Sequence, residues 1–326
     1  MTVALATWSH GLEPNRIAYK LIADGGTALD AVEAGAVYCE ADLSCMSVGR
    51  GAIPDADGKL TLDASIMDHN GNCGSVAFVK HYLPVTSIAR RVMEQTPHVM
   101  LAGVGAEQFA AAQGFTKEEL LTEKARALYE QWKRHPNKLS VRLRRSNEGD
   151  HEYTFEEVGQ DGTVREISRE SLAKPINESH DTIGLLALDS LGHLAGACTT
   201  SGLAFKMHGR VGDSPVIGAG LFVDGEVAGV VATGNGELML RACSAFHAVE
   251  MIRQGIEPGE ALERALARIR KDKHLTDDMQ AGLIAIRKDG VWSARALRPG
   301  FQFAAETAAL SHNVLYDCTE SSYKPA

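Results

Sequence analysis

A threonine stands directly after an aspartate at the start of an apolar segment, in the stretch HDTIGLLALD at residues 180–189. The Asp181–Thr182 bond could be an ordinary junction between a turn and a strand. It could also be a bond that the protein cuts in itself, which would leave Thr182 with a free amine beside its hydroxyl. A free α-amine has a pKa of about 7.7–8.0, so it can accept the proton of a threonine nucleophile near neutral pH.

The next apolar run can bring a second threonine beside the first. Ser190-Leu191-Gly192 separates the two runs, and a three-residue loop with glycine in the left-handed position is a favoured hairpin. This register places Thr182 opposite Thr200, and a register one residue shorter places it opposite Thr199. The alternative to a catalytic role is a cross-strand threonine pair of the kind common in sheets.

The loop HGRVGDSP at 208–215 carries charges suited to an amino acid. The guanidinium of Arg210 could pair with an α-carboxylate, and the carboxylate of Asp213 could accept an α-ammonium. The alternative is a salt bridge between these two side chains.

A third candidate lies in VATGNGE at 231–237, where a strand ends at Thr233-Gly234 and a helix begins. A hydroxyl and free backbone N–H groups at such a junction could stabilise an oxyanion. An ordinary glycine-rich turn before a helix would carry the same residues.

The composition is that of a globular protein, with 326 residues, 44% hydrophobic and 23% charged. The net charge of −9 argues against nucleic acid or an anionic membrane as a partner. No stretch reaches the ~18 apolar residues of a membrane span, and MTVALATWSHGLEPN lacks the features of a signal peptide. We therefore expect a cytoplasmic protein, although a processed secreted or periplasmic chain would look the same.

Neither the cysteines nor the histidines show the spacing of a metal site. The six cysteines contain no C-x-x-C pair, and the twelve histidines contain no i, i+4 pair. Nucleotide-binding and metalloprotease motifs are also missing, and AGVGAEQF at 102–109 lacks the third glycine of a dinucleotide turn. The sequence predicts reduced cysteines, no metal and no cofactor.

Residue patterns predict the elements that must position these groups. We expect strands at 2–8, 59–68 and 73–80, and helices within 15–24 and 27–42 and at about 86–95, 103–113 and 117–133. After residue 181 we expect hairpins at 182–202, 218–234 and 281–297, with helices at about 236–254 and 258–271 between them. Residues 134–180 are polar and poorly periodic, which predicts a linker or loop.

Consecutive hairpins form antiparallel sheets, and apolar runs on both faces imply sheets covered by each other and by helices. The predicted fold class is α+β: a single domain over 1–326, built as a four-layer αββα sandwich. Its two mainly antiparallel sheets are flanked by helices, and residue 182 opens a central strand.

Together and in this order, the motifs HDTIG, ACTTSG, KMHGRVGDSPVIGAG and ATGNGE resemble the glycosylasparaginase (aspartylglucosaminidase) family of N-terminal-nucleophile hydrolases. The N-terminal half agrees through TW at 7–8, GGTALDAVEAG at 25–35, SVGRGAIPDADGKLTLDASIMD at 47–68 and RVMEQTPHVMLAGVGAEQFA at 91–110. The resemblance covers most of the chain and leaves 134–178 unmatched. It implies the four-layer fold and an enzyme of glycoprotein degradation that needs no cofactor.

The resemblance also implies self-cleavage between Asp181 and Thr182, with His180 beside the bond. The products would be an α chain, 1–181, and a β chain, 182–326. Thr182 would then attack the side-chain amide of N4-(β-N-acetylglucosaminyl)-L-asparagine, and water would release aspartate from a β-aspartyl enzyme.

By the same resemblance, Thr200 orients the nucleophile, and Thr233 and Gly234 form the oxyanion hole. Arg210 and Asp213 hold the substrate's α-carboxylate and α-amine. The family further implies a small-molecule substrate and a homodimer of αβ units.

Trp8 is expected to form a pocket wall, and Ser47 is a further candidate for substrate binding. The chain departs from the family pattern at His10, where relatives carry Phe, and at Arg50 and Ala52, where they carry an aromatic residue and glycine. These departures suggest a different leaving group, such as an amino acid from a β-aspartyl peptide, and two alternative functions stay open. One is an isoaspartyl dipeptidase with L-asparaginase activity, and the other is a non-processing homologue that binds amino acids.

Overall fold

The structure is a computed structural model of the chain. It describes residues 1–134, 141–145, 153–158, 164–167, 182–310, 312–318 and 322–325.

The first half of the chain contains both strands and helices. They are β1 Val3–Thr7, the short helix η1 Ser9–Gly11, α1 Leu12–Ala23, α2 Ala28–Ala41, η2 Gly49–Gly51, β2 Leu62–Met67, β3 Cys73–Val79, α3 Val85–Gln95, β4 Met100–Ala102, α4 Gly103–Ala112 and α5 Glu123–Arg134. Local chemistry explains individual ends. Thr27, for example, caps α2 by accepting a hydrogen bond from the N–H of Asp30 at 3.1 Å.

Strands dominate the second half. The elements are β5 Val141–Arg145, β6 Tyr153–Val158, β7 Val164–Ile167, β8 Ile183–Leu188, β9 Leu194–Thr200, β10 Leu221–Asp224, β11 Ala228–Gly234, α6 Gly236–Ala242, α7 Ser244–Arg253, α8 Pro258–Ile269, β12 Ala281–Arg287, β13 Trp292–Ala296, β14 Phe301–Thr307, β15 Val314–Cys318 and β16 Tyr323–Pro325.

Two sheets form the centre of the molecule. The larger has nine strands in the order β16-β15-β14-β1-β8-β9-β2-β3-β4, and the smaller has four in the order β10-β11-β12-β13. Neighbouring strands are antiparallel except β3 and β4, which are parallel. Because β8 is the fifth of nine strands, the residue before it lies at the middle of the larger sheet.

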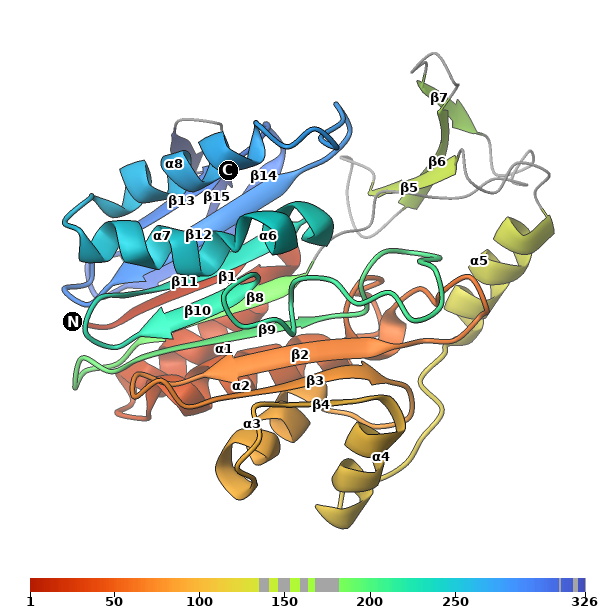
Figure 1. The fold of residues 1–326 in the computed structure, drawn as a ribbon, viewed down its shortest axis with the longest axis horizontal. Coiled ribbons are helices and arrows are strands. Elements are labelled where there is room, and N and C mark those ends of the chain that lie inside the picture. The colour runs from red at the N-terminus through yellow and green to blue at the C-terminus, as the bar shows by residue number, and fades with distance from the viewer. Residues whose placement is uncertain are drawn as a thin grey trace.

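Alternation along β8 shows how the layers stack. Ile183, Leu185 and Ala187 pack with helices α1–α4, whereas Leu186 and Leu188 pack against the smaller sheet. A further core lies between the smaller sheet and α6–α8. Figure 1 shows α7 and α8 on one side of the strands and α1, α2 and α3 on the other. The predicted α+β sandwich of two helix-flanked sheets is therefore confirmed.

The structure corrects several predicted elements. The helix predicted over 236–254 is two helices, because Cys243 between them is left-handed with φ 48°. The helix predicted over 117–133 begins only at Glu123. Strands β14–β16 extend the larger sheet beyond the last predicted hairpin.

Part of the predicted linker carries regular structure. Within 134–180, strands β5, β6 and β7 form a small antiparallel sheet. Residues 134–180 are rich in polar and charged residues, which is why the sequence alone predicts a loop there. That 134–180 is a linker before a cleaved Asp181–Thr182 bond stays a prediction.

Candidate active site

Thr182 directly precedes the central strand β8 and is 5% exposed. In the pairing of β8 with β9, Ile183 lies opposite Thr199. Continuing this antiparallel register by one residue places Thr182 opposite Thr200. The longer of the two predicted registers is therefore confirmed.

The side chain of Thr182 faces the smaller sheet. Gly184, two residues further on the same face, shows how closely the sheets approach, since a Cβ there would lie 2.1 Å from Val231 Cγ1. On this face the Thr182 hydroxyl lies 3.3 Å from the hydroxyl of Ser214. Glycine at 184 thus allows the second sheet and the 208–215 loop to reach the threonine.

The backbone carbonyl of Thr182 is held from two sides. The hydroxyl of Thr7, at the end of β1, donates to it at 2.7 Å, and the hydroxyl of Thr233 donates at 3.3 Å. Thr7 in turn accepts from the N–H of Gly184 at 2.9 Å. Three strands from two sheets therefore fix the backbone position of Thr182.

Trp8 orients Thr233. The indole N–H of Trp8 donates to the Thr233 hydroxyl at 2.8 Å, which leaves that hydroxyl proton free to point at Thr182. Trp8 has φ 64°, an unusual value for a bulky residue that costs on the order of 1–3 kcal/mol. The backbone N–H of Trp8 donates to the Gln302 carbonyl at 2.6 Å, and the ring of Phe301 packs edge-on against the indole at 5.0 Å between ring centroids.

Gly234 follows Thr233 at the end of β11 with φ 114°. A Cβ at this position would lie 2.3 Å from the carbonyl oxygen of Gln280. Only glycine fits here, and it lets the chain turn from the strand into α6 beside the threonine hydroxyl.

Arg210 is held by the carboxylate of Glu237, a residue for which the sequence predicted no role. Its Nε and Nη2 atoms each donate to Glu237 at 2.8 Å, so the ion pair is bidentate. Nη1 instead points toward Gly202 and would lie 3.1 Å from a Cβ there. The guanidinium is therefore fixed by Glu237 through Nε and Nη2, and its Nη1 atom faces Gly202.

Asp213 is 3% exposed, and its Oδ2 atom accepts no hydrogen bond from the described residues. Burial raises the pKa of this carboxyl to about 7 against the opposing pull of Arg210. Its Oδ1 and the Nη2 of Arg210 lie 2.7 and 3.0 Å from the Cβ position of Gly236. Arg210 and Asp213, the two charged residues predicted from the sequence to bind substrate, therefore approach the same point beside Gly236.

A second buried charge pair borders this place. Lys206 and Asp63 are 5% and 0% exposed, and Lys206 Nζ lies 3.6 Å from Asp63 Oδ2, beyond hydrogen-bond distance. Burial lowers the pKa of Lys206. Asp63 also lies opposite Thr200 in the pairing of β2 with β9, which places the charge pair next to the strand that carries Thr200.

Thr200 and Ser47 meet at the end of β9. The Thr200 hydroxyl accepts from the N–H of Gly202 at 2.9 Å. The carbonyl of Ser47 accepts from both the N–H and the hydroxyl of Ser201, at 2.8 and 2.9 Å. The backbone of Ser47 therefore contacts Ser201, the residue after Thr200. The hydroxyl of Ser47 lies 3.8 Å from the Cys45 thiol.

The structure brings most of the predicted site residues into one neighbourhood around the start of β8: Trp8, Ser47, Thr182, Thr200, Arg210, Asp213, Thr233 and Gly234. His180 and Asp181 lie outside the described residues. Of the departures, Arg50 pairs with Glu118 at 2.6 Å, and Ala52 is fully buried.

Sequence reasoning missed five residues that contact these groups: Thr7, Asp63, Lys206, Ser214 and Glu237. Ser214 and Glu237 stand inside the quoted motifs HGRVGDSP and VATGNGE, where proximity in sequence could have indicated them. The contact of Thr7 with Thr182 spans 175 residues and leaves no local signal.

A sandwich of this layering, with a buried threonine opening a central strand beside an arginine and an aspartate, defines the class of N-terminal-nucleophile amidohydrolases. The sequence pattern of the asparaginase family matches residues 13–315. An N(4)-(beta-N-acetylglucosaminyl)-L-asparaginase of Elizabethkingia miricola is 45% identical over 309 residues, which cover 93% of this chain and 80% of the relative.

A rat protein with the same name is 37% identical over 255 residues, 78% of this chain and 73% of its own length. An L-asparaginase-like protein of Drosophila pseudoobscura pseudoobscura is 33% identical over 300 residues, 90% of this chain and 64% of its own length. The chain belongs to the asparaginase family, and the resemblance read from its motifs is confirmed. Among the described residues, every helix is too short or too polar to cross a membrane.

Proposed function

We propose that the protein is a self-cleaving hydrolase of N4-(β-N-acetylglucosaminyl)-L-asparagine. The observation that carries this proposal is that the hydrogen-bonded group of Thr182, Ser214 and Thr233 lies beside Arg210 and Asp213. The names of the Elizabethkingia and rat relatives support the choice of substrate.

In the first reaction, the hydroxyl oxygen of Thr182 attacks the carbonyl carbon of Asp181, and the peptide bond shifts to an ester. Water then splits the ester. Asp181 keeps a new carboxylate at the end of the α chain, and Thr182 gains the free amine of the β chain. The fixed backbone carbonyl of Thr182 supports this step, since it holds the attacking residue in one orientation.

In the second reaction, the new amine accepts the Thr182 hydroxyl proton, and the oxygen attacks the side-chain amide of the bound asparagine. Thr233 and Gly234 stabilise the oxyanion, and Thr200 orients the nucleophile. The glycosylamine leaves with a proton, and water releases aspartate from the β-aspartyl ester. The position of the Thr233 hydroxyl, 3.3 Å from the Thr182 carbonyl, supports its role near the reacting atoms.

Substrate recognition follows from charge. Arg210 binds the α-carboxylate through its Nη1 edge, and Asp213 accepts the α-ammonium on Oδ2, which accepts no hydrogen bond from the described residues. A charge-assisted bond to a buried carboxylate would contribute about 1.5–3 kcal/mol.

The first test is the intact mass of the purified protein under denaturing conditions. We expect two fragments that split between Asp181 and Thr182. A single 35.0 kDa species that persists on prolonged incubation would favour the non-processing amino-acid-binding homologue instead. Thr182→Ala serves as the unprocessed reference.

The second candidate function is an isoaspartyl dipeptidase with L-asparaginase activity. His10 in place of Phe favours it, whereas the 2.6 Å ion pair of Arg50 with Glu118 engages the charge that would otherwise attract a peptide carboxylate. Rates on N-acetylglucosaminyl-asparagine, a β-aspartyl dipeptide and L-asparagine separate the candidates. A preference for the dipeptide would exclude the glycosylasparaginase assignment.

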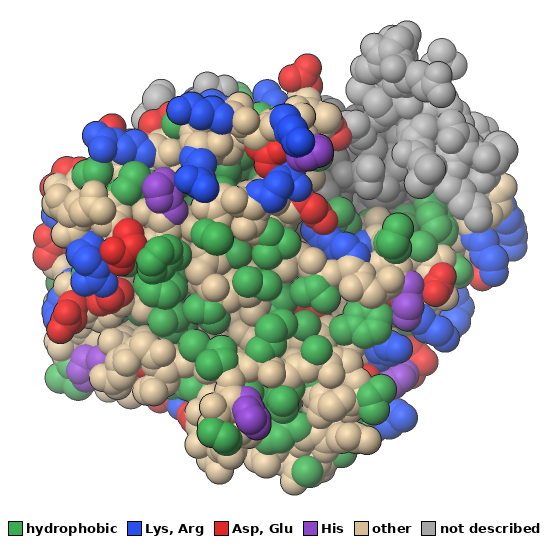
Figure 2. Space-filling model, viewed as in Figure 1, with side chains coloured by type: hydrophobic (Ala, Val, Ile, Leu, Met, Phe, Trp, Pro, Cys, Tyr) green, Lys and Arg blue, Asp and Glu red, His purple; other side chains and the backbone are tan. Residues whose placement is uncertain are grey.

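We also propose that the αβ units pair as a homodimer and that the protein works in the cytoplasm. Figure 2 shows a face whose middle carries hydrophobic and uncharged side chains while charged groups gather toward its edges, a surface suited to pairing. All six cysteines are thiols, as expected in a reducing compartment. Light scattering of the purified protein tests whether it is a homodimer. Fractionation of cells tests whether it is in the cytoplasm.

A further inference from the structure

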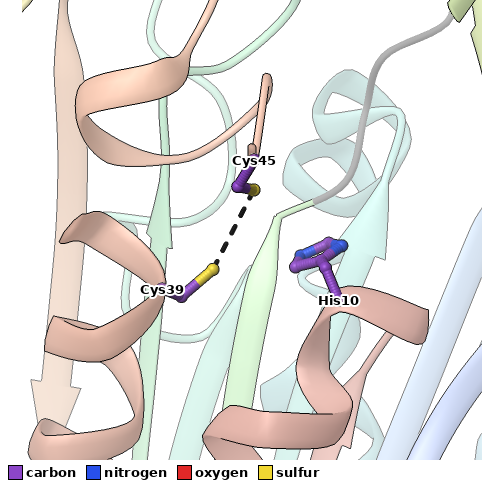
Figure 3. A group of neighbouring side chains, drawn as sticks. All are labelled: His10, Cys39 and Cys45. Atoms are coloured by element: carbon purple, nitrogen blue, oxygen red, sulfur yellow. Dashed lines mark hydrogen bonds between the residues drawn. The ribbon is translucent and has the colours of Figure 1, made fainter. Parts of the chain in front are cut away.

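Three side chains that bind soft metal ions meet at the edge of the candidate active site. His10 lies in η1, Cys39 near the end of α2, and Cys45 in the loop between α2 and η2. One ligand atom from each lies within 4.8 Å of the other two. Figure 3 shows the imidazole ring and the two thiols around one space, although the segments that carry them are far apart in sequence.

The sulfur atoms already have the spacing of a metal site. The Cys39 thiol donates to Cys45 Sγ at 3.9 Å. Two thiolates bound to one tetrahedral zinc ion, each with a bond of about 2.3 Å, are about 3.8 Å apart. An imidazole nitrogen within 4.8 Å of both sulfurs reaches zinc after a shift on the order of 1 Å.

We propose that His10, Cys39 and Cys45 bind a Zn²⁺ ion and leave its fourth coordination position to water. Two thiols release their protons to solvent as the two Zn–S bonds form, and a neutral imidazole supplies the third bond. Two thiolates balance the charge of the ion. The neutral complex therefore suits a place where Cys39 and Cys45 are only 2% and 5% exposed.

The site would connect two segments that border the catalytic groups. His10 follows Trp8, whose indole holds Thr233, by two residues. Cys45 Sγ lies 3.8 Å from the hydroxyl of Ser47, whose carbonyl binds Ser201. Zinc would therefore fasten η1 to the loop before η2, and zinc binding here does not require that the proposed amide hydrolysis be correct.

The test is a titration of the purified, reduced protein with Zn²⁺ in competition with a chromophoric chelator. We expect one tightly bound ion per chain. X-ray absorption at the zinc edge should show two sulfurs at about 2.3 Å and nitrogen at about 2.0–2.1 Å. Cobalt in place of zinc should give thiolate-to-metal charge-transfer bands.

Variants assign the ion to this cluster. We expect Cys39→Ala and Cys45→Ser to remove the charge-transfer bands, and His10→Phe to weaken binding at least tenfold, since loss of even a supporting partner costs about 10–100-fold. Cys243→Ser, an exposed thiol between α6 and α7, is the matched control and should bind zinc as the parent does.

Two outcomes would overturn the proposal. One is binding to the parent no tighter than to the Cys39→Ala, Cys45→Ser double variant. The other is a parent whose non-reducing peptide map shows a Cys39–Cys45 disulfide and that binds no zinc after reduction. Because the absorption spectrum is measured on the parent protein, a variant that fails to fold does not prevent the decision.

Discussion

The two halves of the candidate site differ in how their polar groups are satisfied. In the hydroxyl half, Thr7 and Thr233 both donate to the carbonyl of Thr182, and Trp8 donates to Thr233. In the charged half, Asp213 Oδ2 and Lys206 Nζ are buried and make no hydrogen bond with the described residues. One half is complete without a substrate, whereas the other has polar groups that a substrate could satisfy.

This difference suggests that the hydroxyl half acts mainly on the chemical step and the charged half mainly on substrate binding. A hydrogen-bonded hydroxyl network holds its geometry before the substrate arrives, which is the arrangement that lowers a transition-state barrier. Buried charged groups whose hydrogen-bonding atoms are unsatisfied destabilise the free protein and gain hydrogen bonds when a charged ligand binds. Substitutions in the hydroxyl half should therefore lower kcat, and those in the charged half should raise KM.

Removal of the proposed nucleophile, Thr182, should have the largest effect. Thr182→Ala should abolish chain cleavage and lower activity by about 10⁴–10⁶-fold, as expected when a nucleophile is lost. Mass spectrometry and a glycosylasparagine assay measure the two effects. Thr182→Ser keeps the hydroxyl and should still be cleaved, and normal activity in uncleaved Thr182→Ala would show that another residue is the nucleophile.

Loss of the Thr233 hydroxyl should have the next largest effect. Thr233→Ala removes the proposed oxyanion donor and the acceptor of the Trp8 indole, so kcat should fall by about 10²–10³-fold while KM changes little. Thr233→Ser is the control that restores the hydroxyl. If the loss appeared in KM alone, Thr233 would belong to the binding half.

Asp213 should control binding rather than chemistry. Asp213→Asn should raise KM by about 10- to 150-fold, which corresponds to the ~1.5–3 kcal/mol of a bond to a charged group. Because burial raises the pKa of Asp213 to about 7, the parent's KM should rise as pH falls through that value. The KM of Asp213→Asn should lack this step, and an identical step in both proteins would assign it elsewhere.

The Asp213 carboxyl should also make the free energy of unfolding depend on pH. Its pKa is raised from 3.8 to about 7, so the folded state holds the proton more tightly than the unfolded state. The parent's free energy of unfolding should therefore fall as pH rises from 4 to 7, by at most about 1.4 kcal/mol per pH unit from this group. Glu40, whose pKa burial also raises to about 7, adds to the slope. Urea unfolding of parent and Asp213→Asn at both pH values isolates the Asp213 share.

The pairing of Thr182 with Thr200 could be predicted from the sequence better than the contacts of the charged half. Because hairpin geometry is local, the Ser190–Gly192 loop predicts that Thr182 lies opposite Thr200 or Thr199, and the structure has the first register. The partner of Arg210 is Glu237, and it depends on how the 208–215 loop docks on α6. Such tertiary contacts have no period in the sequence, so the motifs indicated the charged residues but not how they pair.

The smallest effect should come from this ion pair. Glu237 is 41% exposed at its side chain, so solvent screens its bidentate bond to Arg210, and such pairs contribute about 0.2–1 kcal/mol. Glu237→Gln should raise KM less than about fivefold, and raised salt should narrow the difference from the parent. Glu226→Gln, a solvent-facing change after β10, is the control. A loss as large as that of Asp213→Asn would mean that Arg210 depends on Glu237 for its orientation, and the charged half would then be as preorganised as the hydroxyl half.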